Sequence, residues 1–323
     1  MKSKIKNLKV SVCVTIFNES EETVKKLLDA LQSQTLKADE IIMVDASASP
    51  ISSFQFPVSN QFSNSNLQLL HRAGVSRARG RNLAIEMARN EIVAITDAGC
   101  IPHKDWLYEI VKPFSPTTPR LRGTTPDVVA GGYKMIAENS FQKAESIFLG
   151  VKISDMDDDF IAKLNFMPSA RSMAFIKSIW KKAGGFPEKL GNTAEDTLFN
   201  VELLKVGAKF VTAPKAIVDW EMPDTFSEFY KKIFNYAKGD AESGIWWHPI
   251  KKLRTHNLKI MTVFLRYLIL LVFTTQWQAL LIGFYLTFAY RKAGLWGIIL
   301  QFVSDMAVML GFARGILKLC VRI

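Results

Sequence analysis

Two acidic motifs stand where a carboxylate could take part in chemistry. Asp97 directly follows the apolar run Glu91–Thr96, and the pair Glu195-Asp196 opens an apolar helical pattern. An Asp at the end of a strand could instead cap a helix or a turn, and acids at a helix N-terminus stabilise the helix dipole without any further role. Each motif alone therefore leaves a structural and a functional interpretation equally open.

Short apolar runs alternate with helical patterns around these motifs. The runs have the length and β-branched content of buried strands, and the segments between them repeat apolar residues at helical spacing. This alternation indicates an α/β fold with an open, mostly parallel sheet flanked by helices. The predicted strands cover residues 9–17, Glu40–Asp45, Leu67–Leu70, Glu91–Thr96 and Asp127–Met135, and the predicted helices begin after Ser20 and cover residues 76–89, 139–152 and 225–241.

Three polar residues follow strands of this predicted sheet. Asn18, Asp45 and Asp97 each come at the end of an apolar run. Ligands of open α/β sheets bind beyond the carboxyl ends of the parallel strands. We therefore expect these three residues to lie on one rim of the sheet and to form part of a ligand site.

As a set, the motifs resemble the family 2 glycosyltransferases over about residues 8–245. The segments that carry the resemblance are Val14–Glu19, Gln34-Thr35 with Glu40–Asp45, Gly74–Asn82, Asp97-Ala98-Gly99, and Gly184-Gly185-Phe186-Pro187 followed by Glu195-Asp196. The resemblance implies a nucleotide-diphospho-sugar transferase fold of the glycosyltransferase A type. It also implies transfer of a sugar from a nucleotide-diphospho-sugar to an acceptor hydroxyl.

The resemblance assigns roles residue by residue. Asp196 takes the role of general base, with Glu195 beside it, and a single base without a covalent intermediate means inversion at the anomeric carbon. Trp220 could line the acceptor site or be a core aromatic. The donor-binding candidates are Thr15, Phe17, Asn18, Glu19, Asp45, Arg77, Arg79, Arg81, Asn82, Asp97, Ala98 and Gly99, and the acceptor-binding candidates are Gly184, Gly185, Arg171 and Trp220.

The donor motif departs from the family pattern at one position. Gly99 stands where the family has a second acid that binds a divalent metal, as in the subset that reads Thr-Asp-Ala-Gly-Cys. Mg²⁺ or Mn²⁺ could still bind through Asp97 and the donor diphosphate, with Asp219 as a second candidate ligand, since Mg²⁺ needs only one or two carboxylates besides phosphates. We favour a metal, but guanidinium groups could neutralise the leaving diphosphate instead. The arginines available for that role are Arg77, Arg79, Arg81 and Arg171.

The C-terminal segment has a different character from the rest of the chain. The net charge is +11, of which +9 lies between Ile250 and Ile323, where ten Lys and Arg residues interrupt Leu, Ile and Phe runs around a single acid, Asp305. A basic, apolar segment of this kind predicts attachment to an anionic membrane surface rather than binding to nucleic acid. We therefore predict a catalytic domain over residues 1–245 and a membrane-associated helical tail over residues 246–323.

The arrangement of this tail stays open at the level of sequence. A polar stripe predicts an interfacial helix, and the apolar segments Tyr267–Thr275 and Trp277–Tyr290 fit either a hairpin or one longer span. Leu295–Phe312 is long enough to span but contains Gln301 and Asp305, so it needs a protein-facing side. Basic clusters favour the cytoplasmic side, which places the catalytic domain at the cytoplasmic face of the membrane. The polar stripe consists of Lys251, Thr255, Lys259, Thr262 and Arg266.

Three functional hypotheses follow. The first is an inverting transferase that acts on a lipid-linked or polysaccharide acceptor in glycan assembly. The second is an inactive relative that binds nucleotide-sugar or organises a membrane complex, which Gly99 in the donor motif favours. The third, a dehydrogenase, lacks the glycine-rich turn after the first strand, where the chain reads Phe17-Asn18-Glu19. The sequence does not identify the sugar, the nucleotide, the acceptor or the oligomeric state, because loops 46–66 and 113–126 carry no readable pattern.

Overall fold

A computed structural model describes residues 8–51, 66–116, 125–149, 168–190, 193–244, 251–272 and 275–322. Most of loops 46–66 and 113–126 lies outside these ranges. The chain divides into two compact units, which we treat separately. The sheet unit comprises Met1–Lys134, Ile153–Lys189 and Glu195–Trp220, and the helical unit comprises Met135–Lys152, Leu190–Ala194 and Glu221–Ile323. The predicted domain boundary at residue 245 stays a prediction.

An eight-stranded mixed sheet, parallel in its first four strands, forms the centre of the fold, with the strand order β3-β2-β1-β4-β7-β6-β8-β5. β1 pairs in parallel with β2 and β4, and β2 pairs in parallel with β3, whereas β7 is antiparallel to β4 and β6, and β5 is antiparallel to β8. The α/β sheet class is therefore confirmed. The strands are β1 (Val10–Ile16), β2 (Glu40–Asp45), β3 (Leu67–His71), β4 (Ile92–Asp97), β5 (Cys100–Pro102), β6 (Val128–Ile136), β7 (Met173–Ile176) and β8 (Phe210–Glu221).

Three of these strands were not predicted. β5 and β7 have three and four residues, too few to show a periodic pattern. β8 has twelve residues but carries exposed Pro214 and Lys215 in its middle, which interrupt the alternation of buried and exposed positions.

The register of the parallel strands sets the rim that the sequence predicted. Ile16 of β1 lies opposite Asp45 of β2, and Thr15 lies opposite Asp97 of β4. Asp45 and Asp97 therefore flank the end of β1, about 10 Å apart, given the usual spacing between strands. Asn18 follows β1 at the same edge, so the prediction of a shared rim is confirmed.

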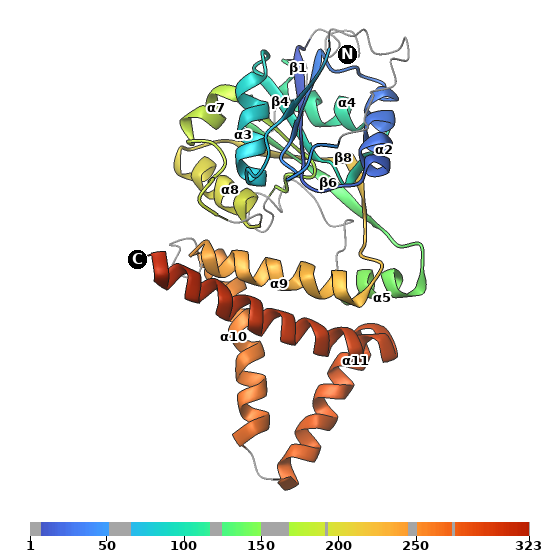
Figure 1. Ribbon diagram of the computed structural model, residues 1–323, viewed down its shortest axis with the longest axis vertical. Helices are drawn as coiled ribbons and strands as arrows, with labels where there is room; N and C mark the ends of the chain where they lie inside the picture. Colours follow the sequence, from blue (N-terminus) through green and yellow to red (C-terminus); the bar gives the residue numbers. More distant parts are fainter. Residues whose placement is uncertain are drawn as a thin grey trace. The chain divides into compact units, whose positions relative to one another are not determined.

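Helices cover both faces of the sheet (Figure 1). On one face α2 and α4 bury Leu27, Leu28 and Trp106 against β1, β2 and β4. On the other face α3, α7 and α8 bury Ile85, Trp180 and other apolar residues. The helices are α2 (Glu21–Gln32), α3 (Arg77–Met87), α4 (Trp106–Val111), α7 (Lys177–Lys182) and α8 (Glu195–Lys205), with a 3₁₀ turn η1 at Lys112–Phe114.

Helix α3 differs from the amphipathic helix that its sequence predicts. Ser76 caps it, because its side chain accepts a hydrogen bond from the backbone N–H of Arg79. Arg81 and Asn82 are both buried, so the inward face of α3 is polar as well as apolar. Buried polar groups of this kind must find partners, and these partners build the candidate site.

In the helical unit, a long kinked helix packs along a shorter amphipathic one. α11 departs from helical geometry at Ala293 and Gly294, and Gly311 and Gly315 in its second half approach the backbone of α9, leaving no room for a side chain. Leu295–Phe312 thus has the protein-facing side that its polar residues required. The helices are α5 (Ser140–Leu149), α9 (Phe226–Glu242), α10 (Lys251–Val272) and α11 (Thr275–Arg322).

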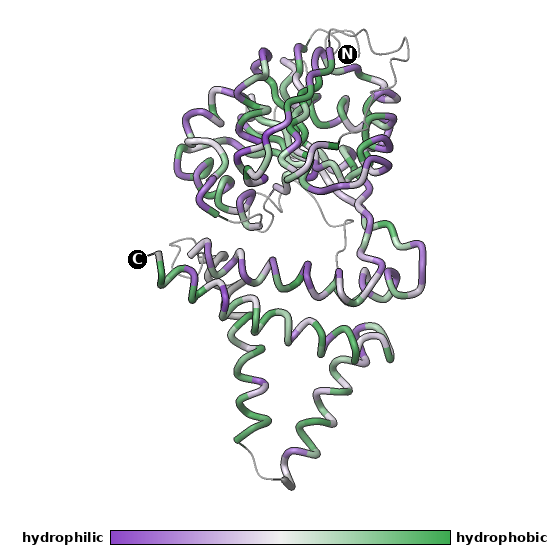
Figure 2. Tube along the Cα trace, viewed as in Figure 1, coloured by the Kyte–Doolittle hydropathy of each residue, from purple (hydrophilic) through white to green (hydrophobic). Residues whose placement is uncertain are grey.

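The helical unit also contains an apolar hairpin. α10 and the first half of α11 form a V that extends away from α9, and the two helices converge at the end of α10 and the start of α11 (Figures 1 and 2). Of 22 exposed large hydrophobic side chains among the described residues, 18 lie between Met261 and Val321. By length and composition, one described helix, Trp277–Val321, could cross a membrane. A long apolar C-terminal helix is therefore present, as predicted.

Candidate active site

A buried arginine joins the two acidic motifs of the sequence. Arg81 of α3 donates one hydrogen bond to Asp97 at the end of β4 and another to Glu195 at the start of α8, both at 2.6 Å. Its guanidinium also lies 5.5 Å from the centre of the Phe186 ring. Motifs 98 residues apart in the sequence, at Asp97 and Glu195, are thus held together by one side chain.

The close approach of α3 to the sheet explains this position. A side chain at Gly80 would lie 2.6 Å from the Cγ2 atom of Thr15 in β1, so glycine lets the helix pack directly on the strand. Arg81 then reaches past the strand ends without exposure to solvent. Burial by itself would lower the pKa of Arg81, but Asp97 and Glu195 raise it above its ordinary value, so the group stays charged.

Asp97 is held in its ionised form. Burial raises the pKa of this carboxyl, but the guanidinium groups of Arg81, Arg171 and Arg77 outweigh burial and bring the pKa below its ordinary value. Only the Oδ1 atom of Asp97 accepts the hydrogen bond from Arg81. The second oxygen is available to a ligand at this partly exposed rim.

The surroundings of Asp196 shift its pKa in the opposite direction from that of Asp97. Burial, and then the negative charges of Glu195 and Asp97, raise its pKa, and Arg81 and Arg171 only partly oppose this shift. One carboxyl oxygen accepts a hydrogen bond from the N–H of Thr197 at 2.8 Å. The side chain is partly exposed rather than sealed in the core. A carboxylate with a raised pKa and access to solvent can act as a general base.

The backbone immediately before this pair is strained. Ala194 has a φ of 67°, in the left-handed region that residues other than glycine rarely adopt. Such a conformation costs on the order of 1–3 kcal/mol and occurs most often at functional sites. It fixes the direction in which Glu195 and Asp196 leave the preceding turn.

Arg171 occupies an aromatic cradle near both carboxylates. Its guanidinium lies 3.9 Å from the Trp220 ring centre and 5.3 Å from that of Tyr133. Its Nη1 atom donates a hydrogen bond to the Ser169 hydroxyl at 3.0 Å. Arg171 and Trp220 were separate candidates for the acceptor site. In the structure the Arg171 guanidinium stacks on the Trp220 ring. Tyr133 and Ser169 were not predicted, since Tyr133 follows an ordinary strand pattern.

The turn after β1 positions a second arginine. Asn18 has a φ of 65°, which asparagine tolerates better than most residues, and its N–H donates to the Ser47 hydroxyl. Glu19 accepts a hydrogen bond from the N–H of Phe17 and pairs with Arg77 at 3.3 Å. Arg77 lies over the Phe17 ring as well. Phe17, Asn18, Glu19 and Arg77, all proposed for the donor, thus form one local group.

Asp45 supports the turn that follows β2. Its two carboxyl oxygens accept hydrogen bonds from the backbone N–H groups of Ser47 and Ile51 at 3.0 and 3.1 Å. The side chain is buried. Its predicted contact with the nucleobase stays a prediction, and these hydrogen bonds also give Asp45 a structural role.

Asn82 and Arg79 make contacts that point to structural roles. Asn82 donates to the carbonyl of Phe186 and accepts from its N–H, which fixes the turn at Gly184 and Gly185, where φ is 84° and 76°. Arg79 pairs with Glu86 and Glu188 on the exposed side of α3. Both residues thus have structural partners, and their proposed contacts with the donor stay predictions.

The carboxylates present limit how a metal could bind. No group of three His, Cys, Asp or Glu side chains with metal-ligand spacing occurs among the described residues. Asp219 instead contacts the His103 ring at 2.8 Å. The proposed pairing of Asp219 with Asp97 at a metal stays a prediction. Ala98 is buried, whereas the position of Gly99 has open space around it.

Comparison with known proteins shows which family the chain resembles. Residues 11–161 match the family described as glycosyl transferase family 2. The chain is 26% identical over 246 residues to "Glycosyltransferase AglE" of Haloferax volcanii, which covers 73% of this chain and 74% of that protein. Among solved structures, the mannosyltransferase PcManGT of Pyrobaculum calidifontis, in complex with GDP-Man and Mn²⁺, matches with a TM-score of 0.61 and 17% identity, over 97% of this chain and 89% of that one. At that identity the structural likeness establishes the glycosyltransferase A-type fold alone.

Proposed function

We propose that this chain, which matches glycosyl transferase family 2 over residues 11–161, is a nucleotide-sugar glycosyltransferase. It transfers the sugar with inversion to a hydroxyl of a lipid-linked or polysaccharide acceptor. The observation that carries the proposal is the bridge from Asp97 through Arg81 to Glu195, because Glu195 directly precedes Asp196 in the chain.

Asp196 is the general base of the proposed reaction. Its raised pKa makes the Asp196 carboxylate a better proton acceptor than an ordinary aspartate. As the acceptor oxygen attacks the anomeric carbon, the hydroxyl proton passes to the Asp196 carboxylate. The bond from the anomeric carbon to the diphosphate oxygen breaks on the opposite face, which inverts the configuration. Glu195 positions Asp196 and keeps Arg81 in place.

Arginines stabilise the leaving diphosphate in this proposal. Negative charge builds on the diphosphate as its bond to the sugar breaks, and preorganised cations that meet this charge lower the barrier. Arg171 and Arg77 both act electrostatically on Asp97, so they lie near the place where the donor would bind. Arg81 is already committed to two carboxylates, and we assign it a positioning role rather than a contact with phosphate.

A divalent metal is a further part of the proposal. The structural relative from Pyrobaculum calidifontis was solved with Mn²⁺ and GDP-Man. Asp97 fits a single-carboxylate site, because its low pKa keeps it ionised and one oxygen is free of the Arg81 hydrogen bond. Mg²⁺ or Mn²⁺ at Asp97 would supply additional positive charge to the diphosphate when bound. Activity that persists in full in excess chelator would remove the metal from this account.

We also propose that the helical unit attaches the enzyme to the cytoplasmic face of a membrane. α10 begins at Lys251 and Lys252, and Arg291 and Lys292 directly precede the break in α11 at Ala293 and Gly294, so both basic segments stand at the end of the hairpin opposite its turn. Basic residues stay on the cytoplasmic side, and a hairpin inserted from that side satisfies both groups. The catalytic domain would then face the cytoplasm.

One observation favours a second candidate function. Gly99 replaces the second acid of the donor motif, so a relative that binds nucleotide-sugar without using it is the alternative. Incubation of the purified chain with a panel of nucleotide-sugars, with Asp196→Asn as control, separates the two. Donor consumption by the wild type alone supports the enzyme, and nucleotide binding without consumption under any acceptor supports the inactive relative.

A further inference from the structure

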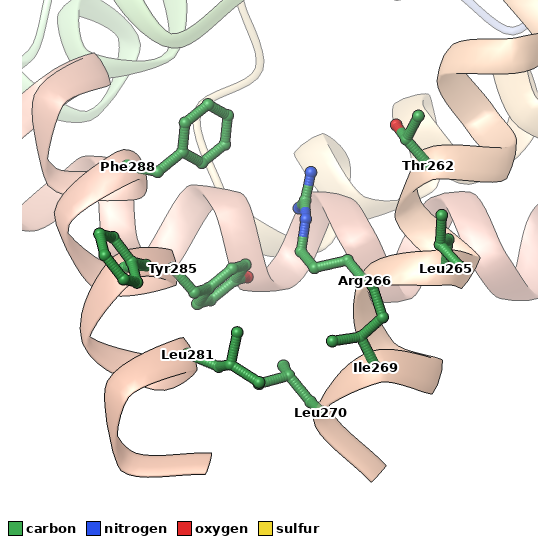
Figure 3. Close-up of a pocket in the computed structure, with 9 residues that line it drawn as sticks. Thr262, Leu265, Arg266, Ile269, Leu270, Leu281, Tyr285 and Phe288 are labelled. Carbon is green, nitrogen blue, oxygen red and sulfur yellow. The ribbon is translucent and has the colours of Figure 1, made fainter. Parts of the chain in front are cut away.

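The hairpin of the helical unit encloses an apolar groove. The groove lies between α10 and the first half of α11 and has a volume of about 390 Å³, within the range of small-molecule sites. Figure 3 shows Leu270 and Leu281 at one end, Phe288 and Thr262 at the other, and Arg266 extending between the two helices. Leucine, isoleucine and phenylalanine supply most of the wall, so the groove suits hydrocarbon rather than a sugar or a nucleotide.

A buried polar network adjoins this groove. Arg266 of α10 pairs with the buried Asp305 of the second half of α11 at 2.6 Å. The hydroxyl groups of Tyr267 and Tyr285 donate to the same carboxylate at 3.3 and 3.0 Å. This network corrects the prediction that Arg266 belongs to an interfacial polar stripe, because its head group turns toward α11. Side chains of the stripe between residues 251 and 259 lie outside the described part.

The network carries one positive charge in excess. Lys292 donates to Gln301, which in turn donates to Asp305, at 2.6 and 2.7 Å. Lys292 also lies 4.7 Å from the ring of Phe288, which lines the groove. Two cations, Arg266 and Lys292, thus face one carboxylate, Asp305. An anionic group at this end of the groove would balance the charge.

We propose that the groove binds the hydrocarbon chain of a single-chain lipid phosphate, the carrier of a lipid-linked acceptor, with its phosphate near Arg266 and Lys292. The inference rests on the proposed function, because it names the acceptor class of that reaction. The exposed apolar residues on the outer faces of the hairpin, such as Leu271 and Ile282, supply the lipid environment from which such a chain would enter.

The dimensions favour one chain over two. From Thr262 to Leu270 the wall of α10 extends about 12 Å, at the helical rise per residue. A groove of this length and of about 390 Å³ between two helices holds a segment of one extended chain. A membrane phospholipid with two acyl chains would leave one of them outside the groove, whereas a lipid phosphate with one chain would leave none.

Binding is tested with the full-length protein in nanodiscs of a zwitterionic diacyl phospholipid. The probe is a photoreactive single-chain isoprenyl phosphate, and the labelled residues are identified by mass spectrometry. We expect labelling of groove residues such as Ile269, Leu281 and Phe284. We also expect this labelling to persist when excess anionic diacyl phospholipid, or the isoprenyl alcohol without phosphate, is added as a competitor. Equal competition by either of these would overturn the proposal, as would labelling confined to the outer faces of the hairpin.

Matched variants separate the groove from the general apolar surface. Leu281→Trp fills the groove, whereas Leu271→Trp places the same side chain on an exposed outer position of the hairpin. Displacing two or three methylene groups from an apolar site lowers affinity on the order of tenfold, so we expect that loss with Leu281→Trp and none with Leu271→Trp. Lys292→Gln, which keeps the Arg266–Asp305 pair, is expected to weaken binding of the phosphate probe but not of the alcohol. Equal affinities in all variants would refute the site.

The readout of transfer distinguishes this proposal from the proposed function. With a lipid-linked acceptor, Leu281→Trp is expected to raise KM for the acceptor while kcat and KM for the donor stay unchanged. With a chain-truncated, water-soluble acceptor, it is expected to match the wild type. If neither acceptor is used by the wild type, the proposed transfer fails, although the binding result stands by itself. If both acceptors are affected alike, the groove does not hold the acceptor lipid.

Discussion

Replacement of Arg81 tests the bridge on which the candidate site depends. Arg81→Met keeps a long side chain but removes the only charge between Asp97 and Glu195 in the described contacts. Removing one partner of a buried ion pair usually costs about 3–5 kcal/mol, because the remaining charge is left uncompensated. Glu195 is buried and contributes most of this cost, whereas the partly exposed Asp97 is better solvated and contributes less.

Arg79→Met is the matched control on the same helix. Arg79 also pairs with two carboxylates, but its side chain is 38% exposed, compared with 5% for Arg81. Exposed pairs contribute about 0–1 kcal/mol. The free energy of unfolding of the purified protein, followed in denaturant by tryptophan fluorescence, should therefore fall several times further for Arg81→Met than for Arg79→Met.

The pH dependence of that difference gives a second, independent check. The folded-state pKa of Asp97 lies below its ordinary value, so its pairing stabilises the fold above the unfolded pKa of about 3.9 and this stabilisation is lost as pH falls through the folded value. In Arg81→Met the Asp97 carboxyl loses its closest cation, so the gap from the wild type should shrink as pH falls below about 4. Equal destabilisation by both substitutions, or a gap independent of pH, would refute the bridge.

The other predictions use the same reasoning. Asp196→Asn should abolish transfer yet stabilise the fold near neutral pH, because the raised pKa means that the ionised Asp196 carboxylate is disfavoured in the folded state. The gain in the thermal midpoint of unfolding should be smallest in acid, where the wild-type carboxyl is protonated. The activity of the wild type should rise with pH through the raised pKa of Asp196, which a pH profile of kcat/KM reports. Gly131→Ala should cost about 1–3 kcal/mol of unfolding free energy, because the new methyl group would overlap Ser172 and approach the Ala216 carbonyl oxygen, whereas Gly99→Ala, with open space around it, should cost little. Arg171→Leu should lower kcat on the order of 10²-fold in single-turnover assays while nucleotide affinity changes little, if its charge acts mainly on the leaving group.

The sequence predicted the parallel half of the fold well because its signals are local. β1, β2 and β4 are short, β-branched and buried on both faces, and Ser20 and Ser76 cap the helices that follow strands. Their order then fixes the rim on which Asp45 and Asp97 lie. The antiparallel half depends on long-range pairing, which is why β7 between β4 and β6 left no readable pattern.

The sequence named candidate site residues but did not show how these residues are arranged. The resemblance to family 2 glycosyltransferases named Arg81, Asp97, Glu195 and Asp196 as candidates, yet nothing in the sequence distinguishes the buried Arg81 from the exposed Arg79 two residues earlier. That difference arises from the packing of Gly80 on Thr15. The same limit applies to the tail, where the sequence left a hairpin and a single longer span open and the described helices form a hairpin.

The most direct test of the account measures sugar transfer and nucleotide affinity on the same preparations of wild type and Asp196→Asn. With the donor that the wild type consumes, we predict that Asp196→Asn loses on the order of 10²-fold or more in single-turnover transfer. Its affinity for the nucleoside diphosphate should stay within about twofold of the wild type, well below one tenfold step in binding. Normal turnover by the variant would contradict the assignment of Asp196 as the base.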